Sequence, residues 1–487
     1  MVKPGSWVRT VALIISVSLP LLPVKSRSVV SGDESWQVVE QAIQHGEFHI
    51  GAFAMELLAR LSDSRSGALL LKGLEDPRPA IRAAAANALR RRPKACFAER
   101  LEAAYFQELQ SDSGAGFWIR LLLVEAVARS GASGVAQFVA DAMADPDSRV
   151  RSGAAAQMIV VLRKHPEAGR ALSRVLREST SIDQLLTAAT VAGIIGDAGT
   201  AADLKRVLDH PDSRVREAAS ISLCQLGDLS GETQVRPLLR RGGRARTPAL
   251  ECLARAGDPA AKQMLLVQLS DAEESVRREA ASLIGRVGLR EAVAALRQRV
   301  ESDASPPVRM AAALSLAELT TLRQPLHMLL NDPDEWNRVQ AAIALLQRGD
   351  LTGKPVIEAA LSSTSLQVRL EASQVLGRIW GRADWSRLVP LMRETGNHPM
   401  RLHAVQAAAQ IRASELLPEL KAILEERRAG GYDLTAAAAE AIAAIGTGEA
   451  VSILREALKS EQFVTRLCAA VELIRMEQDR NRQAPKQ

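Results

Sequence analysis

The stretch "DAEESVRREAASLIGRVG", residues 271–288, combines an acidic turn, a Val-Arg pair, two alanines and an apolar stripe that ends at a glycine. Closely related stretches stand at residues 76–89, 145–159, 209–228 and 331–350. Recurrence of one pattern at a regular spacing is the sequence signature of a repeat architecture. The chain is therefore predicted to consist of repeated units.

Glycines that end the apolar stripes set this spacing. Gly196, Gly227, Gly257 and Gly288 follow one another at steps of 31, 30 and 31 residues, and Gly349 comes 61 residues later. Each unit is therefore about 30 residues long.

One unit is predicted to contain two helices. Apolar residues in 276–287 recur at the spacing of a single buried helical face. Upstream, Asp258 and Pro259 are typical of the N-cap and first position of a preceding helix. Gly288 suits a left-handed residue that ends the second helix.

Such a helical pair cannot bury its apolar face alone, but stacked pairs form one continuous core. Aromatic residues are only 3% of the chain, and small residues such as Ala280 and Ala281 allow helices to approach closely. The predicted fold is all-α, a right-handed α-solenoid of stacked helical hairpins.

The pattern D-P-x-x-x-V-R-x-x-A-A-x-x-L, followed by G-D, resembles the short HEAT repeat of bacterial proteins, the phycobilisome-lyase type. The resemblance extends from about residue 36 to 478, nearly all of the expected mature chain, and implies a HEAT/armadillo-like superhelix. We expect about 13 units within 29–478, with degenerate ones at 110–131, 180–197 and 430–446.

The same resemblance implies that acids in the turns and arginines in the second helices form a structural ladder along the stack, rather than an anion site. The expected members of this ladder are Asp145, Arg151, Asp212, Arg216, Asp271, Arg277, Asp303, Arg309 and Arg369.

The two ends of the chain differ from the repeats. Residues 1–28 are typical of an export signal, with positive residues, an apolar segment at 10–24 and small residues suited to cleavage after Ser28. The alternative is an uncleaved anchor formed by residues 10–24. We expect residues 479–487 to be a disordered polar tail, and the protein to be exported to the periplasm or cell envelope.

Net charge argues against nucleic acid as the main partner. Residues 1–28 contain Lys3, Arg9, Lys25 and Arg27 and no acid, so the remaining chain carries +6 − 4 = +2. That value is nearly neutral for a chain of this length.

The cysteines form no C-x-x-C pair. Cys224 and Cys252 fall on apolar stripes, where a thiol acts as a small hydrophobic group, and we expect this rather than a bridge or a metal site.

No catalytic motif supports an enzyme. The chain lacks G-x-x-x-x-G-K-[ST], H-E-x-x-H and G-x-S-x-G, and His45 and His49 have no apparent further metal ligands. Deoxyhypusine hydroxylase, a HEAT-like enzyme, uses His-Glu pairs for iron, and no His-Glu dipeptide occurs here. We therefore predict no cofactor.

Three hypotheses on function remain. The first is a non-enzymatic scaffold that docks a protein partner on the second helices; the second is a HEAT-like lyase or chaperone for a cofactor-bearing protein. The third is an envelope protein that contacts anionic lipid or polymer through the arginines of 236–246. The candidate partner-binding residues are Arg278, Glu279, Arg286, Gln340, Gln367, Trp380, Trp385, Arg240, Arg241 and Arg244. Trp380 and Trp385 are equally consistent with local packing.

Overall fold

The computed structural model describes residues 32–111, 116–164, 168–240, 246–426 and 432–483. These residues form 29 α-helices and no strand, which confirms the predicted all-α solenoid. In most units, a first helix is followed by a second helix. The second helix of one unit is divided into α23 and α24, so the described residues contain 14 such pairs, one more than the expected 13. The predicted export signal, residues 1–28, lies outside the described residues.

The chain divides into two compact units. Unit 1 comprises Met1–Pro93, Glu99–Ala126 and Arg369–Gln487, and unit 2 comprises Lys94–Ala98 and Val127–Val368. Unit 1 thus contains both ends of the chain, and unit 2 is inserted between them.

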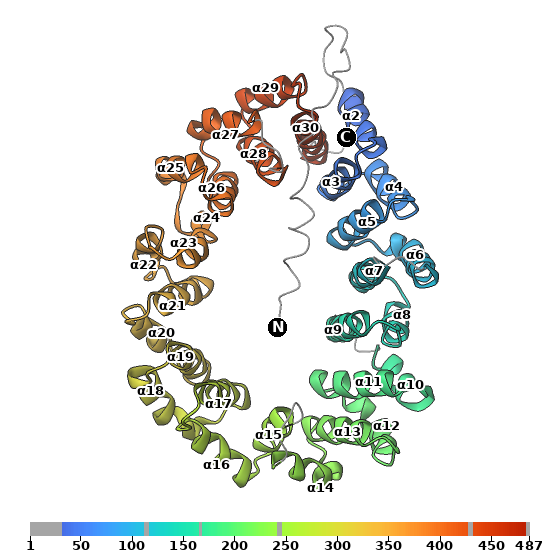
Figure 1. Ribbon diagram of the computed structural model, residues 1–487, viewed down its shortest axis with the longest axis vertical. Helices are drawn as coiled ribbons and strands as arrows, with labels where there is room; N and C mark the ends of the chain where they lie inside the picture. The colour runs from blue at the N-terminus through green and yellow to red at the C-terminus, as the bar shows by residue number, and fades with distance from the viewer. Residues whose placement is uncertain (1–31, 112–115, 165–167, 241–245, 427–431, 484–487) are drawn as a thin grey trace. The chain divides into compact units, whose positions relative to one another are not determined.

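Unit 2 is a curved stack of helical pairs. Its first helices are α8 (Val135–Ala142), α10 (Gly169–Glu178), α12 (Ala201–Val207), α14 (Glu232–Val235), α16 (Pro259–Gln268), α18 (Val293–Ser302), α20 (Gln324–Leu329) and α22 (Lys354–Ala360). Its second helices are α9 (Ser148–Lys164), α11 (Ile182–Ile195), α13 (Ser213–Gln225), α15 (Arg246–Arg255), α17 (Glu274–Val287), α19 (Pro306–Thr320) and α21 (Glu335–Gln347). The second helices form the layer on the concave side of this stack (Figure 1).

Unit 1 is built in the same way from both ends of the chain. Its first helices are α2 (Gly32–Gln44), α4 (Ser64–Gly73), α6 (Ala98–Gln110), α25 (Leu388–Arg393), α27 (Leu417–Leu424) and α29 (Gly448–Ala457). Its second helices are α3 (Phe48–Leu58), α5 (Pro79–Arg91), most of α7 (Gly116–Ser130), most of α23 (Leu366–Ser373), α24 (Leu376–Ile379), α26 (His398–Ile411), α28 (Tyr432–Ile445) and α30 (Phe463–Gln483).

Local sequence signals begin and end the helices as predicted. The Asp258 carboxylate accepts a hydrogen bond from the Ala261 N–H at 2.7 Å, and Pro259 occupies the first turn of α16. Gly288 ends α17 with a φ of 77°, a left-handed conformation that a residue with a Cβ adopts only under strain. The predictions for Asp258, Pro259 and Gly288 are confirmed.

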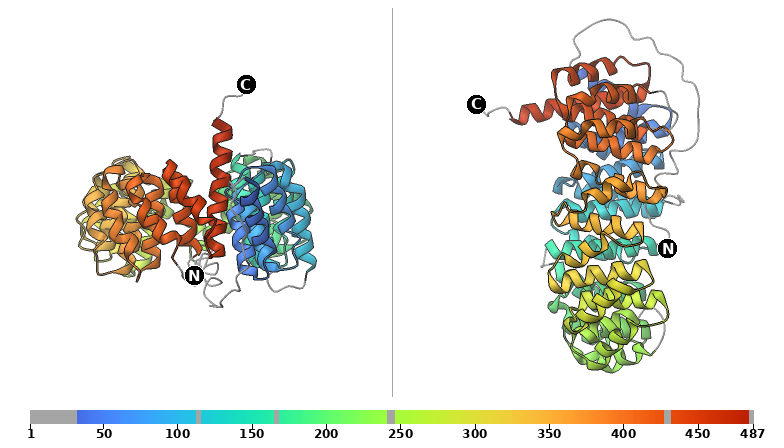
Figure 2. Two further views of the ribbon diagram at one scale, coloured as in Figure 1. Left: turned by 90° about the horizontal axis from the view of Figure 1, so that it is seen from above. Right: turned by 90° about the vertical axis from the view of Figure 1, so that its left-hand side faces the viewer.

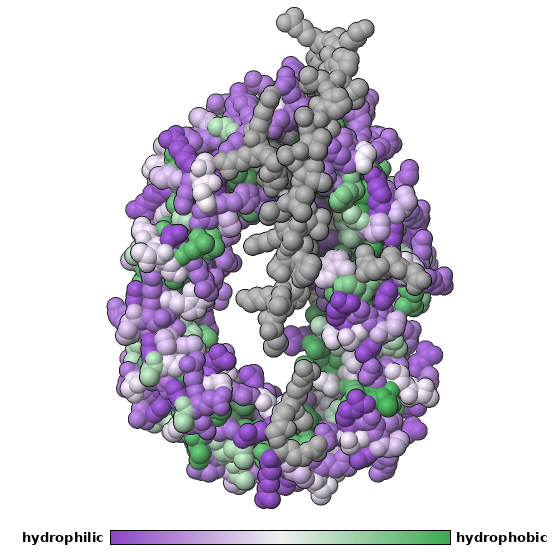
Figure 3. Space-filling model, viewed as in Figure 1, coloured by the Kyte–Doolittle hydropathy of each residue, from purple (hydrophilic) through white to green (hydrophobic). Residues whose placement is uncertain are grey.

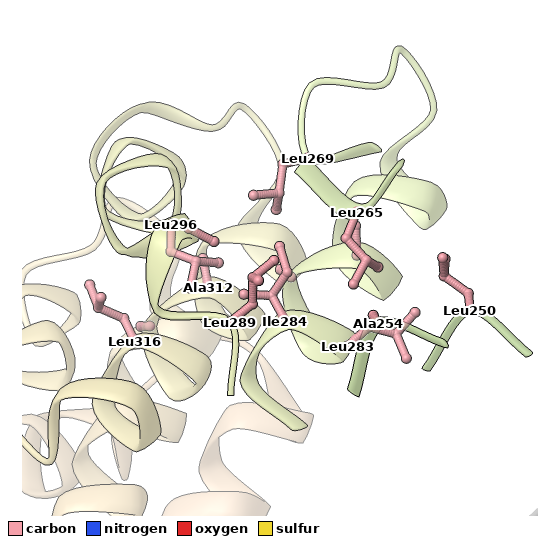
Figure 4. Packing of buried hydrophobic residues seen from close by; sticks show 14 of the residues in the cluster. Leu250, Ala254, Leu265, Leu269, Leu283, Ile284, Leu289, Leu296, Ala312 and Leu316 are labelled. Atoms are coloured by element: carbon pink, nitrogen blue, oxygen red, sulfur yellow. The ribbon is translucent and has the colours of Figure 1, made fainter. Parts of the chain in front are cut away.

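Small residues let successive second helices pack closely. Ala280 and Ala281 of α17 and Ala312 of α19 are fully buried. A Cβ placed on Gly285 would lie 2.8 Å from the Ser315 Cβ, so this contact between α17 and α19 requires glycine. Leucines from α15 to α19, together with Ile284, fill the space between the layers (Figure 4).

The first and last helical pairs of the chain pack on each other within unit 1, and α2 and α3 both contact α30. We call this contact the terminal junction. Arg60, just after α3, binds the Glu472 carboxylate of α30 at 2.8 Å, and the Glu472 side chain is only 1% exposed. The Gln478 amide of α30 donates to the Asp63 carboxylate at 2.6 Å and accepts from the Ser62 N–H at 3.0 Å.

The bounds of α30 correct the predicted tail over residues 479–483, whereas residues 484–487 lie outside the described residues. Residues 479–487 were expected to be disordered, but α30 continues to Gln483 and extends beyond the other helices of unit 1 (Figure 2). Arg482 donates to the Ser62 hydroxyl at 2.5 Å, so a residue of the predicted tail also contributes to the terminal junction.

The prediction of two separate thiols at Cys224 and Cys252 was wrong. The two residues form a disulfide between α13 and α15, with their Cα atoms 5.7 Å apart. Their separation of 28 residues is close to one repeat, so they come from consecutive second helices whose side chains face each other. Cys96 and Cys468 are free thiols, exposed and buried respectively.

Replacing both bridged cysteines by alanine should lower the free energy of unfolding by up to about 3 kcal/mol, because the unfolded chain regains the entropy of an open loop. Thermal melting measures this loss, and Cys96→Ala is the matched control with little expected effect. Titration of the unreduced, denatured protein should detect two thiols of the four cysteines. Four reactive thiols would contradict the disulfide.

Candidate functional site

Four arginines of the expected ladder, Arg151, Arg216, Arg277 and Arg309, bind backbone carbonyls of their own turns. Arg277 donates from Nη1 to the carbonyl oxygens of Asp271 and Ala272 at 2.9 and 3.0 Å. Its remaining edge, Nε and Nη2, donates to both carboxylate oxygens of Asp303 in the next repeat at 2.9 and 3.0 Å. Bidentate bonds of this kind are among the stronger polar contacts in proteins.

The next repeat has the same geometry. Arg309 donates to the Asp303 carbonyl at 2.7 Å and to the Asp332 carboxylate at 2.7 and 2.6 Å. Asp303 therefore joins two repeats, because its carboxylate binds one arginine and its carbonyl the next.

Other members of the expected ladder differ in detail. Arg151 and Arg216 bind the two carbonyls of their own turns, and Arg151 reaches the Asp183 carboxylate at 2.7 Å. Asp212 pairs with Arg214 rather than with Arg216. Asp145 and Asp271 contribute a backbone carbonyl, not a carboxylate, to the arginine of their own repeat. Arg369 stands at the equivalent position of α23.

Burial raises the pKa of the ladder carboxylates, whereas hydrogen bonding lowers it. Burial disfavours the charge on Asp303, but the hydrogen bonds from Arg277 and the Ser305 N–H outweigh it and hold the pKa of Asp303 below its usual value. Burial likewise opposes the charge on Asp332, and the bonds from Arg309 and the Asp334 N–H again leave its pKa lowered. Both groups are therefore ionised in the folded chain at neutral pH.

The candidate partner-binding residues of α17 are exposed, and two of them also contact α15. Arg278, Glu279 and Arg286 are all exposed. Glu279 accepts a hydrogen bond from the Thr247 hydroxyl, and Arg286 binds the Glu251 carboxylate at 3.1 Å. Gln340 is half-buried on α21, and Gln367 is exposed at the start of α23.

The tryptophans do not act as a pair of exposed anchors. Trp380, after α24, is only 6% exposed, and the Arg387 guanidinium lies 5.8 Å from its ring centroid. Trp385 is half-buried in the 3-10 helix Arg382–Arg387. Trp380 is therefore a packing residue, which corrects its inclusion among the partner-binding candidates.

The basic run at 236–246 is only partly described. Arg236 pairs with Glu232 and with Asp258, the latter at 2.6 Å, and Arg240 is exposed. Arg241 and Arg244 lie outside the described residues.

One regular feature of the surface was missed from the sequence. Nine residues after each ladder position, or about two and a half turns, a second helix presents its opposite side. Exposed side chains occupy that place on α9, α11, α15, α17, α19 and α21, and we call them the exposed column: Val160, Ile194, Arg255, Arg286, Glu318 and Gln347. Val160 and Ile194 are 38% and 50% exposed. The column contains two aliphatic residues, two cations, an anion and an amide, whereas the ladder repeats one chemistry.

A small cavity of about 170 Å³ lies beside the terminal junction. Phe53, Leu57 and Leu402 line it together with charged groups that include Arg60 and Glu56. Burial raises the pKa of Glu56, against the opposing effects of Arg91 and Asn87.

Within the described ranges, no three His, Cys, Asp or Glu side chains form a group that could hold a metal ion. No helix among the same residues is long and apolar enough to cross a bilayer. On the face shown in Figure 3, hydrophobic residues form small patches separated by hydrophilic ones.

Residues 243–317 and 322–409 match the family described as HEAT repeats. These two segments, about a third of the chain, are therefore similar to HEAT repeats. They include the ladder contacts of Arg277 and Arg309, and the pairs outside them have the same two-helix build.

Solved structures with similar arrangements are distant in sequence. The karyopherin Kap121p bound to the SUMO protease Ulp1p matches with a TM-score of 0.37 and 15% identity, over 92% of this chain and 57% of that one. Human deoxyhypusine hydroxylase in complex with glycerol matches with a TM-score of 0.23 and 19% identity, over 65% and 99%. This chain thus spans little more than half the length of Kap121p, and no curated protein matches its sequence.

Removing a ladder carboxylate should weaken the stack locally. Asp303→Ala leaves the Nε and Nη2 edge of Arg277 and the Ser305 N–H without their acceptor, so we expect a loss of about 2–3 kcal/mol. Asp271→Ala is the matched control, because Arg277 uses only the backbone carbonyl there, and it should cost under about 1 kcal/mol. Thermal melting with amide exchange of α17 and α19 measures both. Equal losses would argue against the ladder geometry.

Acid should destabilise the chain between about pH 4 and pH 2. Lys205 and Ser230 lower the pKa of Asp228 to about 2, and the Thr352 N–H and hydroxyl together with His327 lower that of Asp350 to about 2. A carboxylate with a lowered pKa binds fewer protons in the folded state, so its stabilisation is present above the unfolded pKa and lost as the pH falls. Melting curves measured through this window should show the decline. A melting temperature independent of pH there would contradict it.

Proposed function

We propose that this chain is a non-enzymatic scaffold of the cell envelope that docks a partner protein on the second helices of unit 2. The exposed column carries the proposal. The ladder uses the same residue types in successive repeats and serves their stacking, whereas the column changes chemistry from repeat to repeat and is free to specify a partner. Stacked repeats provide extended concave surfaces suited to such docking.

The column has the composition of a protein contact surface. Val160 and Ile194 supply exposed aliphatic area on α9 and α11, while Arg286 and Glu318 offer opposite charges on α17 and α19. Interfaces gain affinity from buried apolar and arginine anchors and gain specificity from complementary charge.

The proposed location rests on two observations. Residues 1–28 have the pattern of an export signal, and the Cys224–Cys252 disulfide suits an oxidising compartment. Protection of the intact protein from protease in whole cells, and its release with the envelope fraction, tests this location. Recovery in the cytoplasmic fraction would contradict it.

Crosslinking in native envelopes, followed by purification of the chain, tests the docking face. Ile194→Asp and Arg286→Glu should each abolish a crosslinked partner that the unmodified chain retains. Val267→Asp is the matched control, because Val267 is 62% exposed but lies on the first helix α16. No partner after crosslinking, or equal loss in the control, would refute docking on the second helices.

The finer likeness to the phycobilisome-lyase type of HEAT repeat remains a prediction from the pattern D-P-x-x-x-V-R-x-x-A-A-x-x-L. It supports an alternative role as lyase or chaperone for a cofactor-bearing protein. A visible chromophore in the purified complex would favour that alternative over a simple scaffold.

A further inference from the structure

Arg338, at the ladder position of α21, differs from Arg277 and Arg309 in the two preceding repeats. Arg338 donates from Nη1 to the carbonyls of Asp332 and Pro333 at 2.7 and 3.0 Å, as Arg277 and Arg309 do in their own turns. Its Nε and Nη2 edge makes no ion pair or hydrogen bond with any residue that the structure describes.

The cause is a serine where the preceding repeats have an aspartate. Asp303 and Asp332 each accept a hydrogen bond from the N–H two residues later, at 3.0 and 2.8 Å, and bind the arginine of the repeat before. Ser363 occupies the same place after α22, since its hydroxyl accepts from the Ser365 N–H at 3.1 Å. A neutral hydroxyl therefore stands where Arg338 would meet a carboxylate.

Another repeat has the same serine and compensates for it. Ser179 accepts from the Ser181 N–H at 3.1 Å, so it too replaces the aspartate of the turn. Four residues later, Asp183 supplies the carboxylate that Arg151 binds at 2.7 Å. The residue four positions after Ser363 is Gln367, which carries no charge. The turn that follows Arg338 therefore lacks an acid at both of these positions.

A cavity lies against Arg338. It has a volume of about 300 Å³ and is lined on the side of α22 by Pro355, Val356 and Ala359. Val339 and Leu330 complete its apolar wall, and Glu335 and Arg338 are its charged residues. A guanidinium with unused donors beside an apolar cavity can bind a ligand that has one anionic group flanked by apolar groups.

We propose that this cavity, the Arg338 pocket, binds a single Asp or Glu side chain of a partner protein, flanked in that partner by apolar residues. The carboxylate would take the Nε and Nη2 edge of Arg338, in the arrangement that Asp303 and Asp332 show with Arg277 and Arg309. The flanking apolar side chains would contact Val339, Pro355 and Val356.

The second charge in the pocket selects among anions. Glu335 accepts a hydrogen bond from the Ser363 hydroxyl at 2.7 Å, which holds its carboxylate beside the cavity. A phosphate dianion would be repelled by Glu335 more strongly than a carboxylate, which carries one charge and has the flat shape that matches a guanidinium edge. The pocket therefore favours a carboxylate over a phosphate.

This inference goes beyond the docking face proposed above, because the pocket is lined by the first helix α22 and the beginning of α21 rather than by the exposed column. It rests on the proposed function only in that a protein supplies the carboxylate. The two are separable by experiment, since Ile194→Asp and Arg286→Glu leave the Arg338 pocket unchanged.

Arginine modification by phenylglyoxal, mapped by mass spectrometry on the full chain, tests the pocket. Arg338 should react several-fold faster than Arg277 and Arg309, whose edges are occupied. The probe acetyl-Leu-Asp-Leu-amide should slow the reaction of Arg338 alone. The matched peptide with Asn in place of Asp, and acetate at the same concentration, should not.

Two variants complete the test. Gln367→Asp places an acid where Asp183 stands relative to Arg151, so it should slow modification of Arg338 and remove the effect of the Asp peptide. Ser362→Asp adds the same charge to the same turn at neither ladder position and should change neither result. Equal reactivity of Arg338 and Arg309 would contradict the claim that the Nε and Nη2 edge of Arg338 is unpaired. Equal protection by the Asp peptide, the Asn peptide and acetate would overturn recognition of an acidic side chain.

Discussion

A helical pair of this size cannot bury its apolar face alone, and every other feature of the chain depends on this constraint. An internal pair has a neighbour on either side, whereas the first and last described pairs have only one described neighbour in sequence. Here α2 and α3 pack on α30, so each end supplies the missing neighbour of the other. The Glu472 side chain is buried in its ion pair with Arg60, as expected for a packed interface rather than a loose surface contact.

The repeats divide two tasks between two positions of the second helix. The ladder position holds an arginine on most second helices of unit 2, and Arg277 and Arg309 join consecutive repeats through carbonyls on one side and a carboxylate on the other. The exposed column, on the opposite side of the same helices, varies in charge and polarity. Arg338 marks where the first task is incomplete, because Ser363 and Gln367 supply no carboxylate. In the repeats of Arg277 and Arg309 the Nε and Nη2 edge of the arginine binds the next repeat, whereas at Arg338 it is available to a partner.

Much of the fold follows from the sequence because it is encoded locally. The period, the cap at Asp258 and the left-handed Gly288 each depend on residues within one unit, and the structure bears them out. The contact of Arg60 with Glu472 joins residues 412 positions apart, and no repeat pattern predicts it, because the terminal pairs are the ones that depart from the pattern.

The Cys224–Cys252 disulfide could be predicted from the sequence only in part. The repeat period places the two residues on consecutive second helices, but only the facing of their side chains decides that they bond. The acceptor role of Asp332 could have been found by aligning its turn with that of Asp303. The exposed column could not be predicted, because recognising it requires the exposure of each side chain, which composition and spacing alone do not give.

Amide hydrogen exchange on the unmodified chain and on Arg60→Met tests the terminal junction most directly. The substitution removes the charge that α30 meets at Glu472 while leaving Glu472 its neighbour Arg475. If the ends stabilise each other, amides of α2 and of α30 lose protection together, although they lie about 400 residues apart, while α17 and α19 keep theirs. Loss of protection confined to α3, with α30 unchanged, would contradict the account.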